Sequence, residues 1–376
     1  IVSCSQPQSA ISPPRGYKLF LNPSLDTTKV SNLDIAEALE NFLSTKNNNP
    51  LYNPLWEAGD FKKYPYPFYD IYQIEKGKSG PNTYLPTLLE ILPTDTPHQH
   101  LVKIGFMGSP DSSGTYLRAI YNLLAIQNQG QITFKRILDY NTRSWPIYQK
   151  GSITYHISPN KIFNEKEASE QEAFVRKLCR FFELDPIKLQ YYSCVNPAEI
   201  FQIRGFDYEP QMYSADKGGQ NEVWSRIIYS GNNSEKYEHE VVHSYIYERF
   251  RLQHHPLFDE GLATYLGGSA QLPYPTHRQY VKEYLEIHPE FDLREHLDPY
   301  NAVKIREYTA IPYVIGALIC EYAYRYQDKD SLLQLFQSGK TDDDLWVTLE
   351  GIGLNKENFN EQLRELLQEE TVLIFN

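Results

Sequence analysis

The sequence predicts an α+β protein made of two domains, and three observations favour this class. Residues 17–148 hold one amphipathic helix followed by a run of strand-like segments. From residue 149 strand and helix patterns alternate, and beyond residue 270 the candidate elements are helices. With 376 residues and a hydrophobic content of 41%, the chain is long enough to bury the cores of two domains. We therefore place the domains at 17–148 and 149–376.

The first domain begins with a helix near Ser31 whose apolar residues form a single stripe. Proline and glycine mark the turns between the segments that follow. One helix and a run of antiparallel strands suggest a curved sheet wrapped on a helix, similar to the cone-shaped folds of cystatins and ketosteroid isomerases. No catalytic constellation is visible in this domain. The expected strands lie at residues 87–92, 101–107, 117–126 and 132–140.

The second domain opens with strands expected at residues 152–157 and 189–194, separated by a helix at 164–184. Residues 227–229 form a further short strand that Ser230 and Gly231 end. Helical patterns then continue to the end of the chain. These helices are expected at residues 276–287, 313–327, 331–337, 342–349 and 356–367.

The most informative stretch is the sequence HEVVH, formed by His239, Glu240, Val241, Val242 and His243. On a helix, two histidines four residues apart lie on one face, one turn apart, so both imidazoles can bind the same ion. A catalytic zinc ion takes such ligands and keeps one position for water. His239 and His243 are therefore candidate metal ligands, and Glu240 is a candidate general base.

The start of this helix is marked by Asn232 and Glu235, which have the spacing of a capping box. We expect the helix to begin there and the histidines to lie in its first turns. In the loop that follows the helix, His254 and His255 are expected to be solvated or to contact a substrate.

A candidate third ligand lies downstream in the segment EGLATY, which begins at Glu260. The pattern HExxH followed by E-G-x-A-x-Y resembles the gluzincin metallopeptidases, in which this glutamate is the third zinc ligand. The resemblance implies a gluzincin-like zinc peptidase domain that binds one zinc ion per chain through His239, His243 and Glu260. From the residues alone, Glu260 could instead be a helix-terminal charge, with Asp259 or a water molecule as the third ligand.

The resemblance also implies a mechanism, the hydrolysis of peptide bonds by zinc-activated water with Glu240 as the base. The segment from Tyr313 to Ala317 reads Y-x-x-G-A and resembles the gluzincin segment that carries an oxyanion-stabilising tyrosine. Pro312 is suited to the first turn of a helix, which favours Tyr313 for this role over Tyr308, although both are candidates.

The resemblance also implies how a substrate binds, through two segments that precede the helix carrying His239 and His243. In gluzincins the strand before that helix is an edge strand that pairs with the substrate backbone, which implies this role for residues 227–229. The aminopeptidases of the clan carry G-A-M-E-N in this region to hold the substrate N-terminus. Residues 218–222 read GGQNE instead. We therefore expect an endopeptidase acting on a peptide or protein.

The net charge limits the classes of binding partner, and the N-terminal residues suggest where the protein is located. The net charge of −12 disfavours nucleic acid and anionic membrane surfaces as partners, and no apolar run approaches the roughly 18 residues of a membrane span. Cys4 follows Ile1, Val2 and Ser3, which resembles the end of a bacterial lipobox. We expect a lipid anchor at Cys4, a tether over residues 1–16, and a place in the bacterial cell envelope, facing the periplasm or the surface.

Three points stay open at this stage. Cys179 and Cys194 could pair, although buried free thiols fit the pattern better. The chain could be a non-catalytic, zinc-containing binding or scaffold lipoprotein. It could also be a zinc hydrolase of a non-peptide bond. The complete set of two histidines and two glutamates favours catalysis, because a degenerate site usually loses its general base.

Overall fold

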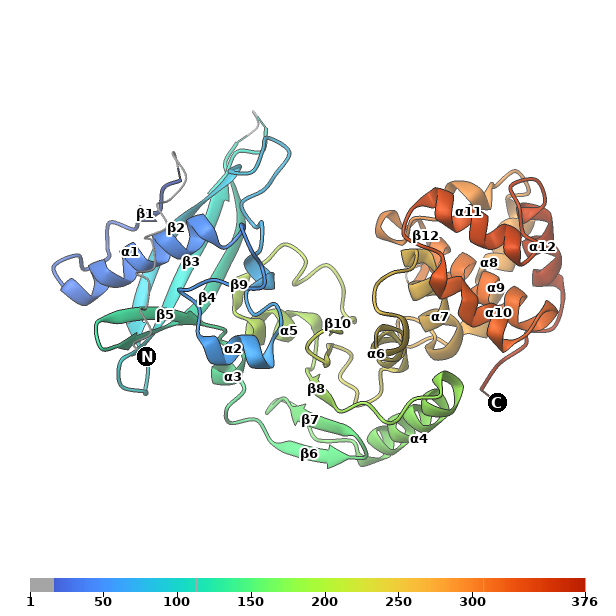
Figure 1. Cartoon of the computed structure of the whole chain (residues 1–376), viewed down its shortest axis with the longest axis horizontal. Helices are drawn as coiled ribbons and strands as arrows, with labels where there is room; N and C mark the ends of the chain where they lie inside the picture. Colours follow the sequence, from blue (N-terminus) through green and yellow to red (C-terminus); the bar gives the residue numbers. More distant parts are fainter. Residues whose placement is uncertain (1–16, 112–113, 307, 376) are drawn as a thin grey trace, which may run out of the picture. The chain divides into compact units, whose positions relative to one another are not determined.

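A computed structural model of the chain describes residues 17–375 except 112–113 and 307 (Figure 1). The protein contains both helices and strands, and the strands form several sheets. This agrees with the mixed secondary structure that the predicted α+β class implies. Its described residues form two compact units. Unit 1 runs to Trp145 and includes Pro197–Asp216, whereas unit 2 comprises Pro146–Asn196 and the chain from Lys217 onward. The expected division after residue 148 did not include the return of Pro197–Asp216 to unit 1.

Unit 1 is built on one sheet with the strand order β1-β2-β3-β4-β5, to which β9 adds by pairing with β4. Helix α1 (Val30–Thr45) turns Ile35, Leu39 and Phe42 into the same core as the sheet residues Phe106 and Phe134. Most pairs in the sheet are antiparallel, whereas β1 is parallel to β2. The strands are β1 (Phe20–Leu21), β2 (Tyr84–Pro93), β3 (Gln99–Gly108), β4 (Tyr116–Asn128), β5 (Gln131–Lys135) and β9 (Phe206–Tyr208).

Three of the four strands expected in unit 1 match β2, β3 and β4, and the fourth was too long. Strand β5 ends at Lys135, and Leu138–Asn141 forms the short helix α3. Leu138 is fully buried in this helix, so the apolar residues after β5 contribute to the interior without extending the sheet. The remaining helical segments of unit 1 are α2 (Ala58–Lys63), η1 (Tyr69–Ile71) and α5 (Pro197–Arg204).

Unit 2 contains a five-stranded sheet with the order β10-β11-β8-β7-β6. The edge role implied for residues 227–229 is wrong, because β11 lies between β10 and β8 and its two sides are paired. The edge strand beside the histidine helix is β10, which is antiparallel to β11. The strands are β6 (Ile147–Lys150), β7 (Ile153–Ile157), β8 (Leu189–Ser193), β10 (Gly219–Glu222) and β11 (Ile227–Ser230).

Helix α4 (Glu165–Phe182) matches the helix expected at 164–184. The side chain of Asn164 accepts a hydrogen bond from the Glu167 amide and caps the helix. Phe174 and Leu178 of α4 share one core with the sheet and with Val241 of the histidine helix. This core fixes the histidine helix against α4.

The histidine helix α6 (Glu238–Phe250) begins later than the capping pattern predicted. The Asn232 side chain accepts a hydrogen bond from the Gly218 amide at 2.8 Å, and Glu235 forms a buried ion pair with Lys161 at 2.8 Å. Both candidate capping side chains are therefore used in tertiary contacts. The histidines still lie in the first two turns, as expected.

The other helices of unit 2 agree with the predicted positions to within a few residues. They pack in one core with α6, and α7 lies against both α6 and α9. The segment is not wholly helical, because β12 (Lys304–Arg306) pairs with β13 (Thr309–Ala310). The helices are α7 (Pro256–Gly267), α8 (Tyr274–Ile287), α9 (Ile311–Tyr326), α10 (Lys329–Gln334), α11 (Asp342–Gly351) and α12 (Phe359–Gln368), with short turns η2 (Leu293–Glu295), η3 (Pro299–Asn301) and η4 (Leu335–Gln337).

Two further expectations concern cysteines and the membrane. Among the described residues, Cys179, Cys194 and Cys320 form no disulfide, so the pairing of Cys179 with Cys194 that the sequence left open is not present. Cys4 and the tether lie outside the described residues. Within the described part of the chain, every helix is too short or too polar to cross a bilayer.

Candidate metal centre

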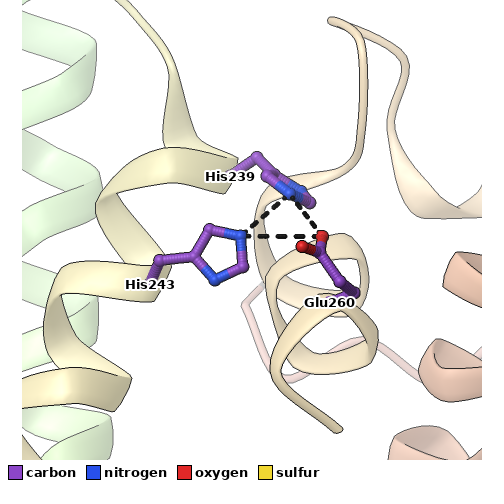
Figure 2. A group of neighbouring side chains, drawn as sticks. All are labelled: His239, His243 and Glu260. Atoms are coloured by element: carbon purple, nitrogen blue, oxygen red, sulfur yellow. Dashed lines mark hydrogen bonds and ion pairs between the residues drawn. The ribbon is translucent and has the colours of Figure 1, made fainter. Parts of the chain in front are cut away.

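His239, His243 and Glu260 converge on one point between α6 and α7 (Figure 2). The two histidines lie one turn apart on α6, and Glu260 lies on α7 with its carboxylate directed toward them. Both histidines are buried, and Glu260 is half-buried. The structure therefore brings together the three residues that the sequence offered as metal ligands.

The three facing atoms have the spacing of one face of a small tetrahedron. The Nε2 atoms of His239 and His243 are 3.1 Å apart, and Oε2 of Glu260 lies 3.2 Å from the first and 3.7 Å from the second. Zinc bonds of about 2.0–2.1 Å place tetrahedral ligand atoms about 3.3–3.4 Å apart. The observed spacing agrees with this value.

The other nitrogen of each ring determines which form of the imidazole faces the centre. Nδ1 of His239 lies 2.7 Å from the carbonyl oxygen of Gly268, and Nδ1 of His243 lies 3.2 Å from Oδ2 of Asp259. Neither oxygen carries a proton to donate, so in the neutral imidazoles we assign the proton to Nδ1. Each Nε2 atom then presents a lone pair to the centre.

Two imidazole lone pairs and a carboxylate oxygen at such short distances repel one another unless a cation lies between them. Zinc, which prefers nitrogen and oxygen ligands in a tetrahedron, satisfies all three atoms and leaves a fourth position for water. A proton on His243 is the alternative cation. The donor atoms and their spacing therefore fit a zinc ion.

The electrostatics of the pocket favour a positive charge at His243. Burial alone would lower the pKa of His243, but Asp259, Glu260 and Glu240 raise it to about 10. Burial would also raise the pKa of Asp259, yet His243 and His254 hold it well below its ordinary value. These three carboxylates surround the histidines with negative charge, which attracts a metal ion as well as a proton.

Glu240, the candidate base, lies beside the centre and is 8% exposed. Burial raises the pKa of its carboxyl group, although the imidazoles of His243 and His239 lower it. Its backbone carbonyl accepts a hydrogen bond from the side chain of Asn221 on β10. Asn221 also donates to the hydroxyl of Ser244 at 2.8 Å, so the edge strand is attached to α6.

Tyr313 lies in the first turn of α9, as the position of Pro312 predicted. Its ring is nearly parallel to that of His239, with centroids 6.1 Å apart and an angle of 7°. Burial raises the pKa of Tyr313 well above its ordinary value, and Glu260 and Glu240 raise it further. The phenol is therefore a protonated hydrogen-bond donor beside the candidate ligands. Tyr308 directly precedes β13.

Side chains of α4 accept hydrogen bonds from backbone amides at and just before the start of α6. The side chain of Gln171 accepts the Tyr237 amide at 2.7 Å, and Glu167 accepts the Glu235 amide at 2.9 Å. The contact with Gln171 pairs the backbone donor of the N-cap residue Tyr237, and the contact with Glu167 holds the segment just before the helix. They fix the segment that carries His239.

The expectation that His254 and His255 are solvated is wrong, because the two residues are only 4% and 5% exposed. Nδ1 of His255 accepts the Leu257 amide at 3.2 Å and caps α7, the helix that carries Glu260. Nε2 of His254 lies 3.5 Å from Oδ1 of Asp259. Both histidines therefore contact the first turn of α7, the helix that carries the candidate ligand Glu260.

Sequence reasoning also missed two residues that contact the candidate ligands. Asp259 was considered only as an alternative ligand, and the carbonyl of Gly268 was not considered. One feature of the sequence could have indicated the contact of Asp259 with His243. Asp259 directly precedes Glu260, so it must lie close to the candidate ligands. Gly268 is the C-cap residue of α7 and has a φ of 72°.

A cavity of about 500 Å³ adjoins His239 near the start of α6. Its wall combines the aromatic rings of Tyr237 and Tyr265 with the carboxylates of Glu170 and Glu238. Of the three candidate ligands, His239 alone lines this cavity.

Comparison with known proteins gives no relative from which to transfer a function. The chain matches no protein-family model, and no curated protein matches it. The functional case therefore rests on the residues and geometry of the site.

Proposed function

We propose that this chain is a zinc-dependent peptidase of gluzincin type, with His239, His243 and Glu260 as the ligands of one zinc ion. The observation that carries the proposal is the arrangement of the three ligand atoms, 3.1, 3.2 and 3.7 Å apart, with both Nε2 lone pairs turned inward. The sequence pattern HExxH followed by E-G-x-A-x-Y supports the same assignment.

The proposed chemistry is the addition of water to a peptide carbonyl. A bound zinc ion supplies Lewis acidity and lowers the pKa of its water. Glu240 accepts a proton from that water and delivers it to the nitrogen of the leaving amine, whose bond to the carbonyl carbon then breaks. Tyr313 donates its hydroxyl proton in a hydrogen bond to the oxyanion of the tetrahedral intermediate.

The substrate is proposed to bind as an extended strand along β10, the edge of the unit 2 sheet. This assignment moves the role that the gluzincin resemblance implied for residues 227–229 to the neighbouring strand. The attachment of Asn221 to α6 keeps β10 close to Glu240. Since residues 218–222 lack the aminopeptidase motif, we propose endopeptidase action.

The proposed location is the bacterial cell envelope, with a lipid anchor at Cys4. This proposal rests on the four-residue lipobox resemblance at the N-terminus. Mass spectrometry of the mature N-terminus tests it, because a lipid on Cys4 adds the mass of its acyl chains. An unmodified cysteine in the protein from its host would contradict the anchor.

Cleavage of a mixed peptide library tests the proposed activity. We expect cleavage at internal bonds, its loss on treatment with a chelator and its return on addition of zinc. A scaffold protein would bind zinc without cleaving any peptide, and a hydrolase of another bond would leave the library intact. Glu240→Gln, which keeps the zinc ligands, is the matched control for contaminating peptidases.

A further inference from the structure

The carboxylate of Asp259 lies between two imidazoles that come from different segments. Its Oδ2 atom is 3.2 Å from Nδ1 of His243 on α6, and its Oδ1 atom is 3.5 Å from Nε2 of His254, in the connection between α6 and α7. In the part of the chain that the structure describes, Nδ1 of His243 and Oδ1 of Asp259 have no hydrogen-bond partner, so we describe both contacts as close polar contacts. Asp259 links the proposed ligand His243 to His254.

The imidazole of His254 is held in place by aromatic packing. Its side chain is 1% exposed, and its ring packs edge to face on Phe336 with centroids 4.8 Å apart. Phe336 in turn stacks on Phe250 at the end of α6, with centroids 4.9 Å apart. The ring of His254 therefore has little freedom to turn away from Asp259.

The tautomer of His254 follows from its two nitrogens. Among the described residues, Nδ1 of His254 has no hydrogen-bond partner, whereas Nε2 faces a carboxylate oxygen. A buried polar group is stabilised when its proton points at an acceptor. We therefore assign the ring proton of neutral His254 to Nε2, directed at Asp259.

A single contact would not fix the orientation of Asp259, because the last torsion of an aspartate has a broad energy well. The same holds for the ring torsion of His243. With one carboxylate oxygen beside His254 and the other beside His243, the carboxylate plane is defined at both ends. The contact at His254 thus restricts the ring of His243 through Asp259.

We propose that His254 is a positioning residue that orients the metal ligand His243 through the carboxylate of Asp259. The inference rests on the proposed zinc site and goes beyond it, because His254 itself binds neither metal nor substrate. Partners that orient a metal ligand typically contribute about 10- to 100-fold to metal affinity. His254 acts one contact further away, so we expect the lower end of that range.

The test is the zinc affinity of purified variants, measured by competition with a chelator of known strength. His254→Phe retains an aromatic ring against Phe336 but removes the donor, and we expect it to weaken zinc binding on the order of tenfold. His254→Gln places an amide nitrogen near the position of Nε2 and should retain most of the affinity. His296→Phe is the matched control, because His296 stacks on Phe291 away from the site.

A double-mutant cycle separates positioning from general packing. If His254 acts through Asp259, then adding His254→Phe to Asp259→Ala should not weaken zinc binding beyond the loss caused by Asp259→Ala alone. Losses that multiply would overturn the inference, as would wild-type affinity in His254→Phe. A loss in His254→Gln equal to that in His254→Phe would also overturn it.

The zinc affinity of the wild type distinguishes this inference from the proposed function. If the wild type binds zinc and His254→Phe has no effect, the positioning role of His254 is wrong but the zinc site stands. If the wild type does not bind zinc, both proposals are wrong. A circular dichroism spectrum and a melting temperature for each variant identify losses that come from unfolding, and His254→Gln provides the readout if Asp259→Ala does not fold.

Discussion

Gly261 of α7 and Gly316 of α9 pack backbone against backbone. A Cβ atom added to Gly261 would lie 2.6 Å from the Cα atom of Gly316, and one added to Gly316 would lie 2.8 Å from the Cα atom of Gly261. Gly261 directly follows Glu260, and Gly316 lies three residues after Tyr313. This contact therefore sets the distance between the proposed zinc ligand and the proposed oxyanion donor.

Gly316→Ala should disturb both stability and catalysis, because the backbone on the other side of the contact cannot move as a side chain can. We expect a loss of about 1–3 kcal/mol in the free energy of unfolding, typical of overpacking, and a lower kcat from the displacement of Tyr313. Denaturant unfolding and peptide-cleavage kinetics measure the two effects.

The control for this substitution is Gly351→Ala on α11, where an added Cβ would meet no atom within 4 Å. We expect that variant to keep its stability and its activity. Equal behaviour of the two variants would contradict the role given to the contact between α7 and α9.

Tyr313→Phe should lower kcat by roughly 10- to 1000-fold with little change in KM, because the hydroxyl contacts the oxyanion mainly in the transition state. Tyr308→Phe should have a smaller effect, since Tyr313 is the tyrosine placed beside Glu260 and Glu240. Parallel kinetics on the two variants decide between them. A large loss only in Tyr308→Phe would transfer the role to Tyr308.

Glu240→Gln should retain zinc and lose at least about 100-fold of the activity, as expected when a general base is removed. Glu260→Ala should lose zinc, because Glu260 is the proposed third ligand. Metal content and kcat are measured on both variants. If Glu240→Gln lost the metal while Glu260→Ala kept it, the roles of the two glutamates would be reversed.

Zinc affinity should rise with pH well into the alkaline range. The pKa of His243 is raised to about 10, so in the metal-free protein a proton occupies this ligand below that pH and zinc must displace it. Apparent affinity should then increase up to about tenfold per pH unit between pH 7.5 and 9, with about one proton released per ion. Chelator competition and calorimetry in two buffers measure these quantities.

The contrary result in this experiment is a zinc affinity that no longer changes above pH 7.5. A histidine with its ordinary pKa of about 6.5 is already neutral there. Such a plateau would mean that Asp259 and Glu260 do not raise the pKa of His243 as the geometry indicates.

Local sequence patterns predicted most helices and strands because their periodicity reflects one-sided burial. The stripe of α1 and the strand patterns of β2, β3 and β4 are examples. The start of α6 was misplaced because capping residues have more than one use. Asn232 and Glu235 had the spacing of a cap, but their side chains bind Gly218 and Lys161, which the sequence places far away.

Strand order and the assignment of segments to units depend on contacts between distant residues, which no local pattern reveals. Strand β11 reads as a short apolar strand whether it lies at the edge of the sheet or inside it. Likewise, Pro197–Asp216 joins unit 1 because β9 pairs with β4 and Arg204 forms an ion pair with Asp70. Neither contact leaves a trace in the neighbouring sequence.

In the candidate site, too, some residues could be predicted from local sequence, whereas others depend on contacts between segments. His239, Glu240 and His243 are set by a four-residue helical spacing, so the sequence predicted their shared face. Asp259 and His254 act through contacts between α6, α7 and the segment that connects them. Their part in orienting His243 emerged only when the fold brought these segments together.

The metal content of the purified protein tests the central proposal most directly. Elemental analysis of the wild type, prepared without chelator, should find about one zinc ion per chain, and His243→Ala should contain essentially none. No zinc in the folded wild type would contradict the proposed centre. Undiminished zinc in His243→Ala would contradict the assignment of His239, His243 and Glu260 as its ligands.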